Sequence, residues 1–112
     1  MQDGIYHLRV FSNFNDYGEG IAVVRDNFIN GGNGGFIFTG TKQEQDDDQF
    51  SCTLDIKQWN HEVISVLGPM THFTLCLTGT NTADNGFIAN GYMAGQDDAE
   101  VAVQAKYLSP IA

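Results

Sequence analysis

Between Phe50 and Lys57 the chain alternates without a break between apolar and polar side chains. A period of two places successive side chains on opposite faces of a β-strand. One face of such a segment can pack on a core while the other meets water, which is typical of an antiparallel sheet. The segment is therefore predicted to be a half-buried antiparallel strand, with a core face made by Phe50, Cys52, Leu54 and Ile56.

Short segments of the same kind recur along the whole chain, separated by residues that favour turns. Thirteen glycines and only two prolines favour strands joined by tight turns over helices. Besides the segment at 50–57, strands are predicted at residues 4–11, 18–25, 28–29, 36–41, 72–78, 87–93 and 100–108.

Three connecting segments do not follow a strand pattern. Residues 12–17 are rich in Asn and Asp and are predicted to form a turn. Residues 31–35 include four glycines, which permit positive φ, so this run is predicted to break regular structure. Residues 58–70 are predicted to form either a helical turn or an irregular cover.

About eight short strands at this spacing fit an all-β sandwich or barrel. We predict a small antiparallel up-and-down barrel with little helix, formed by a single domain over residues 1–112. In a barrel the segments at 4–11 and 100–108 pair with each other, which removes exposed edge strands. A Greek-key sandwich is the alternative, because hairpin signals alone do not fix the order of the strands.

The two cysteines are expected on different faces of their strands. Cys52 is in register with its apolar neighbours, whereas Cys76 is out of register with Phe73, Leu75 and Leu77. A disulfide between them is therefore not expected, because the two side chains point apart. Both are predicted to be free, small residues, as is usual in a reducing compartment.

The most charged stretch of the chain runs from residue 43 to residue 49 and separates two predicted strands. It holds Glu44, Asp46, Asp47 and Asp48, with no basic residue between them. Such carboxylates repel each other and are not buried without partners, so the stretch is predicted to be an exposed turn. The turn is either a binding surface or a solubilising loop.

The whole chain is acidic, with a net charge of -9 and a pI near 4.3. Nucleic acids and anionic membranes are recognised by clusters of Lys and Arg, and the chain has only five such residues. A basic protein is therefore the expected partner. We find no signal-peptide pattern and no apolar run approaching the roughly 20 residues that span a bilayer, so a cytoplasmic location is expected.

Sequence motifs for metal binding or catalysis are missing. The acidic stretch lacks the ligand spacing, the glycine and the closing glutamate of a calcium-binding EF-hand loop. His7, His61 and His72 do not have the spacing of a zinc site. The chain has neither a complete phosphate-binding loop nor a Gly-x-Ser-x-Gly elbow. We therefore predict no metal, no cofactor and no catalytic residue.

Three aromatic residues are candidates for a ligand site or an interface. Phe36 and Phe38 are most simply core residues, and Trp59 is placed to seal one end of the barrel. An interior enclosed by about eight strands is just wide enough to be filled by side chains or to hold one small apolar molecule. Trp59, Phe36 and Phe38 therefore remain possible ligand or interface residues.

Some large apolar residues are predicted to lie outside the barrel. Ile5, Phe11 and Ile88 sit opposite the core faces of their strands, and Ile37 lies between two phenylalanines. Covering such residues in a homodimer would bury this surface, so a homodimer is expected.

Six short motifs occur in order along nearly the whole chain, namely Asp3-Gly4-Ile5-Tyr6, Gly18-Glu19-Gly20-Ile21, Gly31-Gly32, Thr39-Gly40, Ser65-Val66-Leu67 and Gln104-Ala105-Lys106-Tyr107. Together they resemble the GrlR family of negative regulators of bacterial type III secretion gene expression. The resemblance implies a small lipocalin-like barrel that can dimerise. It also implies a regulator that binds and restrains an activator with a helix-turn-helix domain.

The resemblance gives the acidic stretch a role as well. In this family an exposed tetrad of alternating Glu and Asp on a strand connection is associated with function. The matching place here is Glu44-Gln45-Asp46-Asp47, where Gln45 removes one charge and the following Asp48 restores it. We therefore expect a non-enzymatic regulator that binds its partner through this turn. The alternative is a barrel that carries a small apolar ligand, which requires an interior cavity of about 300 Å³ or more.

Overall fold

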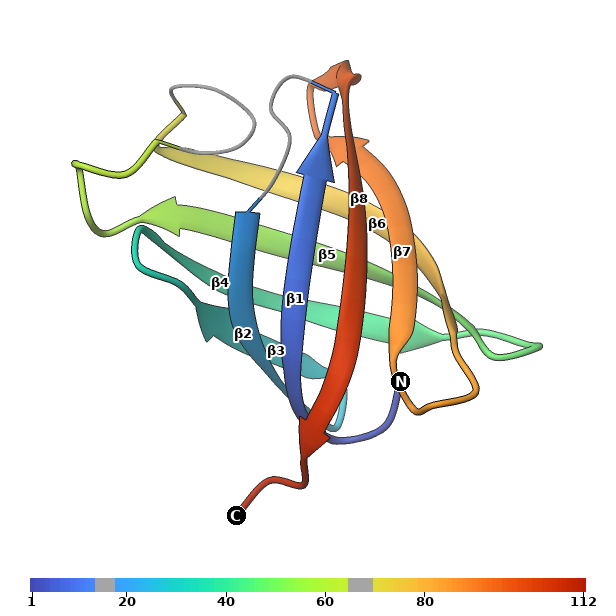
Figure 1. Ribbon diagram of the computed structural model, residues 1–112. Coiled ribbons are helices and arrows are strands. Elements are labelled where there is room, and N and C mark those ends of the chain that lie inside the picture. The colour runs from blue at the N-terminus through green and yellow to red at the C-terminus, as the bar shows by residue number, and fades with distance from the viewer. Residues whose placement is uncertain (14–17, 65–69) are drawn as a thin grey trace.

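In the computed structural model, which describes residues 1–13, 18–64 and 70–112, eight antiparallel strands close into a barrel (Figure 1). Each strand pairs with the next along the chain, and the first pairs with the last. The predicted all-β up-and-down barrel is thus confirmed. The strands are β1 (Gly4–Ser12), β2 (Gly18–Arg25), β3 (Phe28–Gly32), β4 (Phe36–Glu44), β5 (Gln49–Gln58), β6 (His72–Asn81), β7 (Phe87–Met93) and β8 (Gln96–Ser109).

The period-two pattern determines which side chains fill the barrel. Along β5 the four apolar residues predicted for the core are all buried. The same alternation puts Tyr6 and Leu8 of β1 and Val101 and Val103 of β8 inside. Buried apolar side chains from all eight strands form one core cluster. Closing the barrel therefore needs no covering helix.

The glycine-rich run at 31–35 does not interrupt the sheet where we predicted. β3 continues through Gly31 and Gly32, which pair with both β2 and β4, and only residues 33–35 form the turn. None of the glycines in this range has positive φ. Gly31 is instead required by close packing, because a Cβ there would lie 2.0 Å from the carbonyl oxygen of Ile21.

A second boundary also differs from the prediction. β4 extends to Glu44 rather than ending at Thr41. The inward positions of this strand continue past Phe36 and Phe38 to Lys42, whose side chain enters the barrel. Glu44 thus belongs to a strand and not to the exposed turn.

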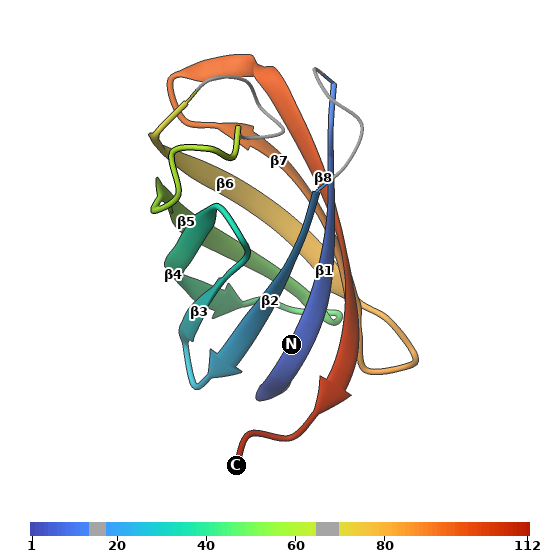
Figure 2. The ribbon, with the colours of Figure 1, turned by 60° about the vertical axis from the view of Figure 1, so that its left-hand side comes forward.

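The up-and-down order places the connections at two ends of the barrel (Figure 2). The start of the chain and the β2–β3, β4–β5 and β6–β7 turns lie at one end, here called the acidic end. Residues 12–13, at the end of β1, and residues 59–64, after β5, lie at the opposite end. Residues 14–17 and 65–69 lie outside the described residues, and 59–64 form bends and turns without a helix.

Candidate functional site

The β4–β5 connection is a tight turn that carries three of the predicted acidic residues. The amide of Gln49 donates a hydrogen bond of 3.2 Å to the carbonyl oxygen of Asp46, and Asp47 and Asp48 have φ values of 62° and 60°. Two positive φ values within a bond of this kind define a type I′ turn, whose twist suits a hairpin. Asn, Asp and Gly are favoured at the first central position and Gly at the second, so Asp48 occupies the second position at a cost in stability.

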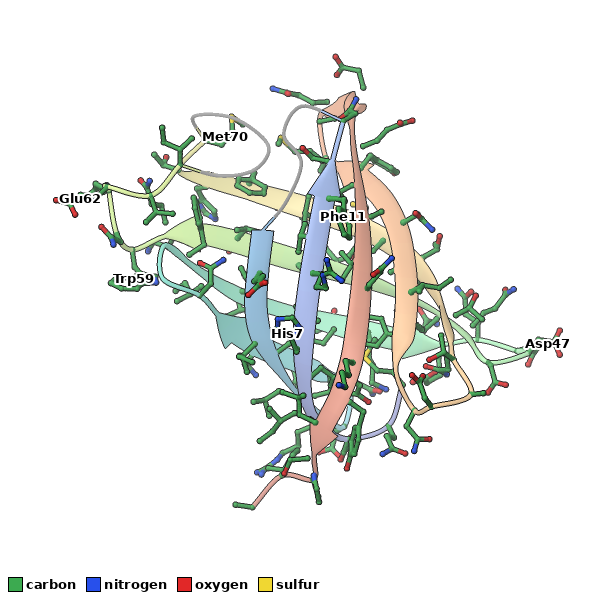
Figure 3. The ribbon with its side chains drawn as sticks, in the orientation of Figure 1. His7, Phe11, Asp47, Trp59, Glu62 and Met70 are labelled. Carbon is green, nitrogen blue, oxygen red and sulfur yellow. The ribbon has the colours of Figure 1, made fainter. Side chains whose placement is uncertain are left out.

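The side chains of Asp46, Asp47 and Asp48 are exposed on a backbone that is held in place. Asp47 projects from the tip of the turn, away from the barrel (Figure 3). The amide of Asn81 at the end of β6 donates to the carbonyl oxygen of Asp48 at 2.8 Å. Within the described part of the chain, no Lys or Arg forms an ion pair with the three carboxylates. The turn therefore presents uncompensated negative charge.

Glu44 differs from the three aspartates because it is bound to the barrel. Its Oε1 lies 2.7 Å from Nζ of the buried Lys42 and 3.0 Å from the amino group of Met1. Partial burial alone would raise the pKa of Glu44, but the hydrogen bonds from Lys42 and from the amino group outweigh it and lower that pKa. Glu44 thus compensates an inward-facing cation and anchors the start of the turn.

Further carboxylates surround the turn at the acidic end. Asp3 and Asp26 lie on neighbouring connections, where Oδ1 of Asp3 accepts a 3.0 Å hydrogen bond from the amide of Asp26. Asp84 lies on the β6–β7 turn, and hydrogen bonds from the Thr82 hydroxyl and the Gly86 amide lower its pKa. With Glu44 and the three aspartates, seven of the fourteen acidic residues are at this end. The negative field is therefore wider than the turn itself.

The barrel interior holds a cavity of about 90 Å³. Two of the aromatic candidates, Phe36 and Phe38, line it. Trp59 does not line the cavity and lies at the opposite end, with 55% of its surface exposed (Figure 3). Its Nε1 donates to the carbonyl oxygen of Asn33 at 3.0 Å, so Trp59 braces the turn between β3 and β4.

The outer surface carries the apolar residues that the alternation placed there. Ile37 and Ile88 are 43% and 49% exposed, while Ile5 and Phe11 are half-buried. Ile21, which we did not single out from the sequence, is also exposed. It pairs with a glycine of β3 that pairs in turn with Ile37, so the two isoleucines flank a position without a side chain.

The cysteines, histidines and remaining carboxylates that the structure describes do not gather into a metal site. Cys52 is buried and Cys76 is half-buried on the outer face, and both are free, as predicted. No cluster of three or more His, Cys, Asp or Glu that could hold a metal occurs among the residues the structure describes. In the same residues no helix is long and apolar enough to cross a membrane.

The structure is a closed barrel that displays a fixed acidic turn, and its described residues contain no metal-ligand cluster. These features are typical of a small binding protein. A comparison with protein families is consistent with that class. The chain belongs to the GrlR family, described as negative regulators of the type III secretion system, whose sequence model matches residues 1–110. No curated protein matches the chain. The family resemblance seen in the short motifs is thus confirmed.

Proposed function

We propose that this protein is a non-enzymatic cytoplasmic regulator that restrains a helix-turn-helix activator of type III secretion genes through its acidic turn. Family membership supports negative regulation. The observation that carries the proposed mechanism is the exposed, uncompensated charge of Asp46, Asp47 and Asp48 on a fixed type I′ turn. Carboxylates clustered in this way attract Lys and Arg side chains that the activator would otherwise place on DNA phosphates.

The charge of the turn acts mainly on the rate of association. Exposed ion pairs contribute only about 0.2 to 1 kcal/mol each, so three of them need apolar contacts nearby for useful affinity. Electrostatic steering, by contrast, raises association rates by about 10-fold or more at low salt. The expected signature is an association rate that falls as salt rises, with a smaller effect on dissociation.

The test compares two variants that remove the same number of charges from opposite ends. One carries Asp46→Asn, Asp47→Asn and Asp48→Asn, and the control carries Glu62→Gln, Asp98→Asn and Glu100→Gln, which are exposed at the opposite end. With a purified helix-turn-helix activator at low salt, we expect the first variant to associate about 10-fold more slowly and the control to remain close to the parent. Equal rates for the two variants would reduce the turn to a solubilising loop.

The small volume of the barrel interior argues against the alternative that the protein carries a drug-sized ligand. Pockets for drug-sized molecules measure about 300 to 1,000 Å³. The cavity of about 90 Å³ lined by Phe36 and Phe38 is well below that range. The size of the interior therefore supports the surface-binding proposal.

We also propose that two copies associate through the outer apolar residues. Ile21 on β2 and Ile37 on β4 present exposed apolar surface on either side of Gly32 of β3. Light scattering of the parent at micromolar concentration is expected to give twice the 12.3 kDa mass of one chain. The Ile37→Lys variant is expected to give the single-chain mass, and a parent that scatters as a single chain would contradict this assembly.

A further inference from the structure

Aromatic rings fill the barrel interior at the acidic end. Neighbouring ring centroids in the series Tyr107, Tyr6, Phe87 and Phe50 lie 5.3 to 5.6 Å apart, in tilted and edge-on arrangements. These are favourable geometries for ring pairs. This end of the interior is therefore closed by a continuous aromatic cluster.

The opposite end and the middle of the barrel are built differently. Phe36 and Phe73 form one ring pair, with centroids 6.3 Å apart. Between this pair and the aromatic cluster, mainly aliphatic side chains line the cavity of about 90 Å³. The aliphatic residues include Leu8, Leu54, Leu75, Leu77 and Val103.

Two of the lining side chains pack over glycines of the barrel wall. The ring of Phe38 is seated over Gly20, where a Cβ would lie 2.7 Å from the ring. Leu54 is seated over Gly40 in the same way, at 2.9 Å from the position of a Cβ. These glycines leave room for the larger side chains at the barrel wall, so Phe38 and Leu54 fill less of the barrel interior.

The polar side chains of the described lining are bonded to the protein or lie on the outer face. Oδ1 of Asn33 accepts from the amides of Gly35 and Phe36, both at 2.9 Å, and its Nδ2 donates to the carbonyl oxygen of Glu19 at 2.8 Å. The carboxylate of Glu19 lies 3.6 Å from Nε2 of His7 on the outer face. A ligand with a polar group would lose its hydrogen bonds to water without replacement, which disfavours it.

We propose that this cavity is a binding site for a compact, uncharged apolar ligand. Its volume of about 90 Å³ lies between the roughly 10 to 15 Å³ needed for one water and the about 150 Å³ of an apolar cavity that stays dry and binds benzene or xenon. The lining matches such a ligand in chemistry and the volume limits it to a few heavy atoms. The site is separate from the acidic turn, so it does not depend on the proposed regulatory function.

The test uses xenon and benzene as probes and the methyl resonances of Leu and Val as reporters. Saturable shifts are expected for methyl groups that line the cavity, including those of Leu8 and Val103. Ala22→Leu fills the space from inside, whereas Ala102→Leu adds the same side chain on the outer face. We expect the first to weaken benzene binding at least 10-fold and the second to change it less than 2-fold.

A second variant keeps the proposal testable if Ala22→Leu does not fold. Leu54→Ala enlarges the cavity and is expected to tighten benzene binding by 10-fold or more. The proposal would be overturned if Leu54→Ala bound benzene with the same affinity as the parent. It would also be overturned if benzene shifted the methyl resonances of a folded Ala22→Leu variant as much as those of the parent. Tighter binding of decanoate than of benzene would also overturn it, because that ligand is neither compact nor uncharged.

Discussion

Replacing Glu44 with alanine is expected to weaken the fold rather than only the binding surface. The side chain of Lys42 is 5% exposed, and its Nζ lies 2.7 Å from Oε1 of Glu44. Removing one partner of a fully buried ion pair costs about 3 to 5 kcal/mol. The Glu44 side chain is 43% exposed, so water reaches the ammonium group once the carboxylate is gone. We therefore expect a smaller loss, of about 1 to 3 kcal/mol in the free energy of unfolding.

Urea denaturation followed by circular dichroism measures this loss. Asp46→Ala is the matched control, since it removes one exposed carboxylate from the same hairpin and should change stability by less than about 0.5 kcal/mol. Lys42→Met combined with Glu44→Ala should recover part of the loss, because no buried charge is then left unpaired. If Glu44→Ala is no less stable than Asp46→Ala, the anchoring role is refuted.

The same pair gives an expected dependence on pH. The folded structure lowers the pKa of Glu44 below its ordinary value of 4.5, so the folded state keeps this carboxylate charged where the unfolded state takes up a proton. The stabilisation is present above pH 4.5 and is lost as the pH falls through the folded pKa. The stability difference between the parent and Glu44→Ala should therefore shrink below pH 4.5, and a constant difference would contradict the assignment.

Further predictions follow from the turns and the thiols. Asp47→Asn with Asp48→Gly supplies the preferred type I′ residues, so thermal unfolding should show a gain of roughly 1 kcal/mol while partner association slows. Gly31→Ala should lower stability by about 1 to 3 kcal/mol, because its Cβ meets a backbone oxygen at 2.0 Å, whereas Gly34→Ala meets nothing within 4 Å and should be near neutral in the same melts. Without denaturant, a thiol reagent at pH 8 should label Cys76 and leave Cys52 unlabelled. Burial, and to a smaller extent the charge of Cys76, raises the pKa of the Cys52 thiol to about 11.

The strand pattern was predictable because burial on one face imposes a period of two. Phe50 to Ile56 shows this directly, and each apolar residue of that face is buried. Closure of the barrel was also predictable, since the segments at both ends of the chain had one apolar face and would otherwise be edges. The pairing register and the exact ends of the strands were not predictable, because they depend on the neighbouring strands. From the sequence alone, Gly31 and Gly32 were predicted to end the strand. In the structure they pair with β2 and β4, whose backbones approach them closely.

The role of Lys42 was hidden by the same dependence on context. A single lysine beside an acidic stretch looks like part of a solvated surface, since Lys is almost never fully buried without a partner. Lys42 is an even number of residues from Phe36 and Phe38, so on one continuous strand all three side chains point into the barrel. This can be inferred only when the strand is known to extend to Glu44. The interior cavity had no comparable sequence signal, because it arises from how side chains of several strands meet.

The acidic stretch, read from the sequence as four similar charges, is divided by the fold into two parts. Glu44 offsets a buried cation at the end of β4, and three aspartates remain exposed for the basic partner that we propose. Asp48 occupies a backbone position where Gly would be more stable, and Asp47 lies at the outermost point of the turn. A loop that served only solubility could carry its charges at unstrained positions nearby. Positive φ also occurs at Asp26 and Asn85 on the neighbouring turns, so the conformation alone does not mark a function. The observation that favours a binding role is that a charge is kept at Asp48, where Gly would be more stable.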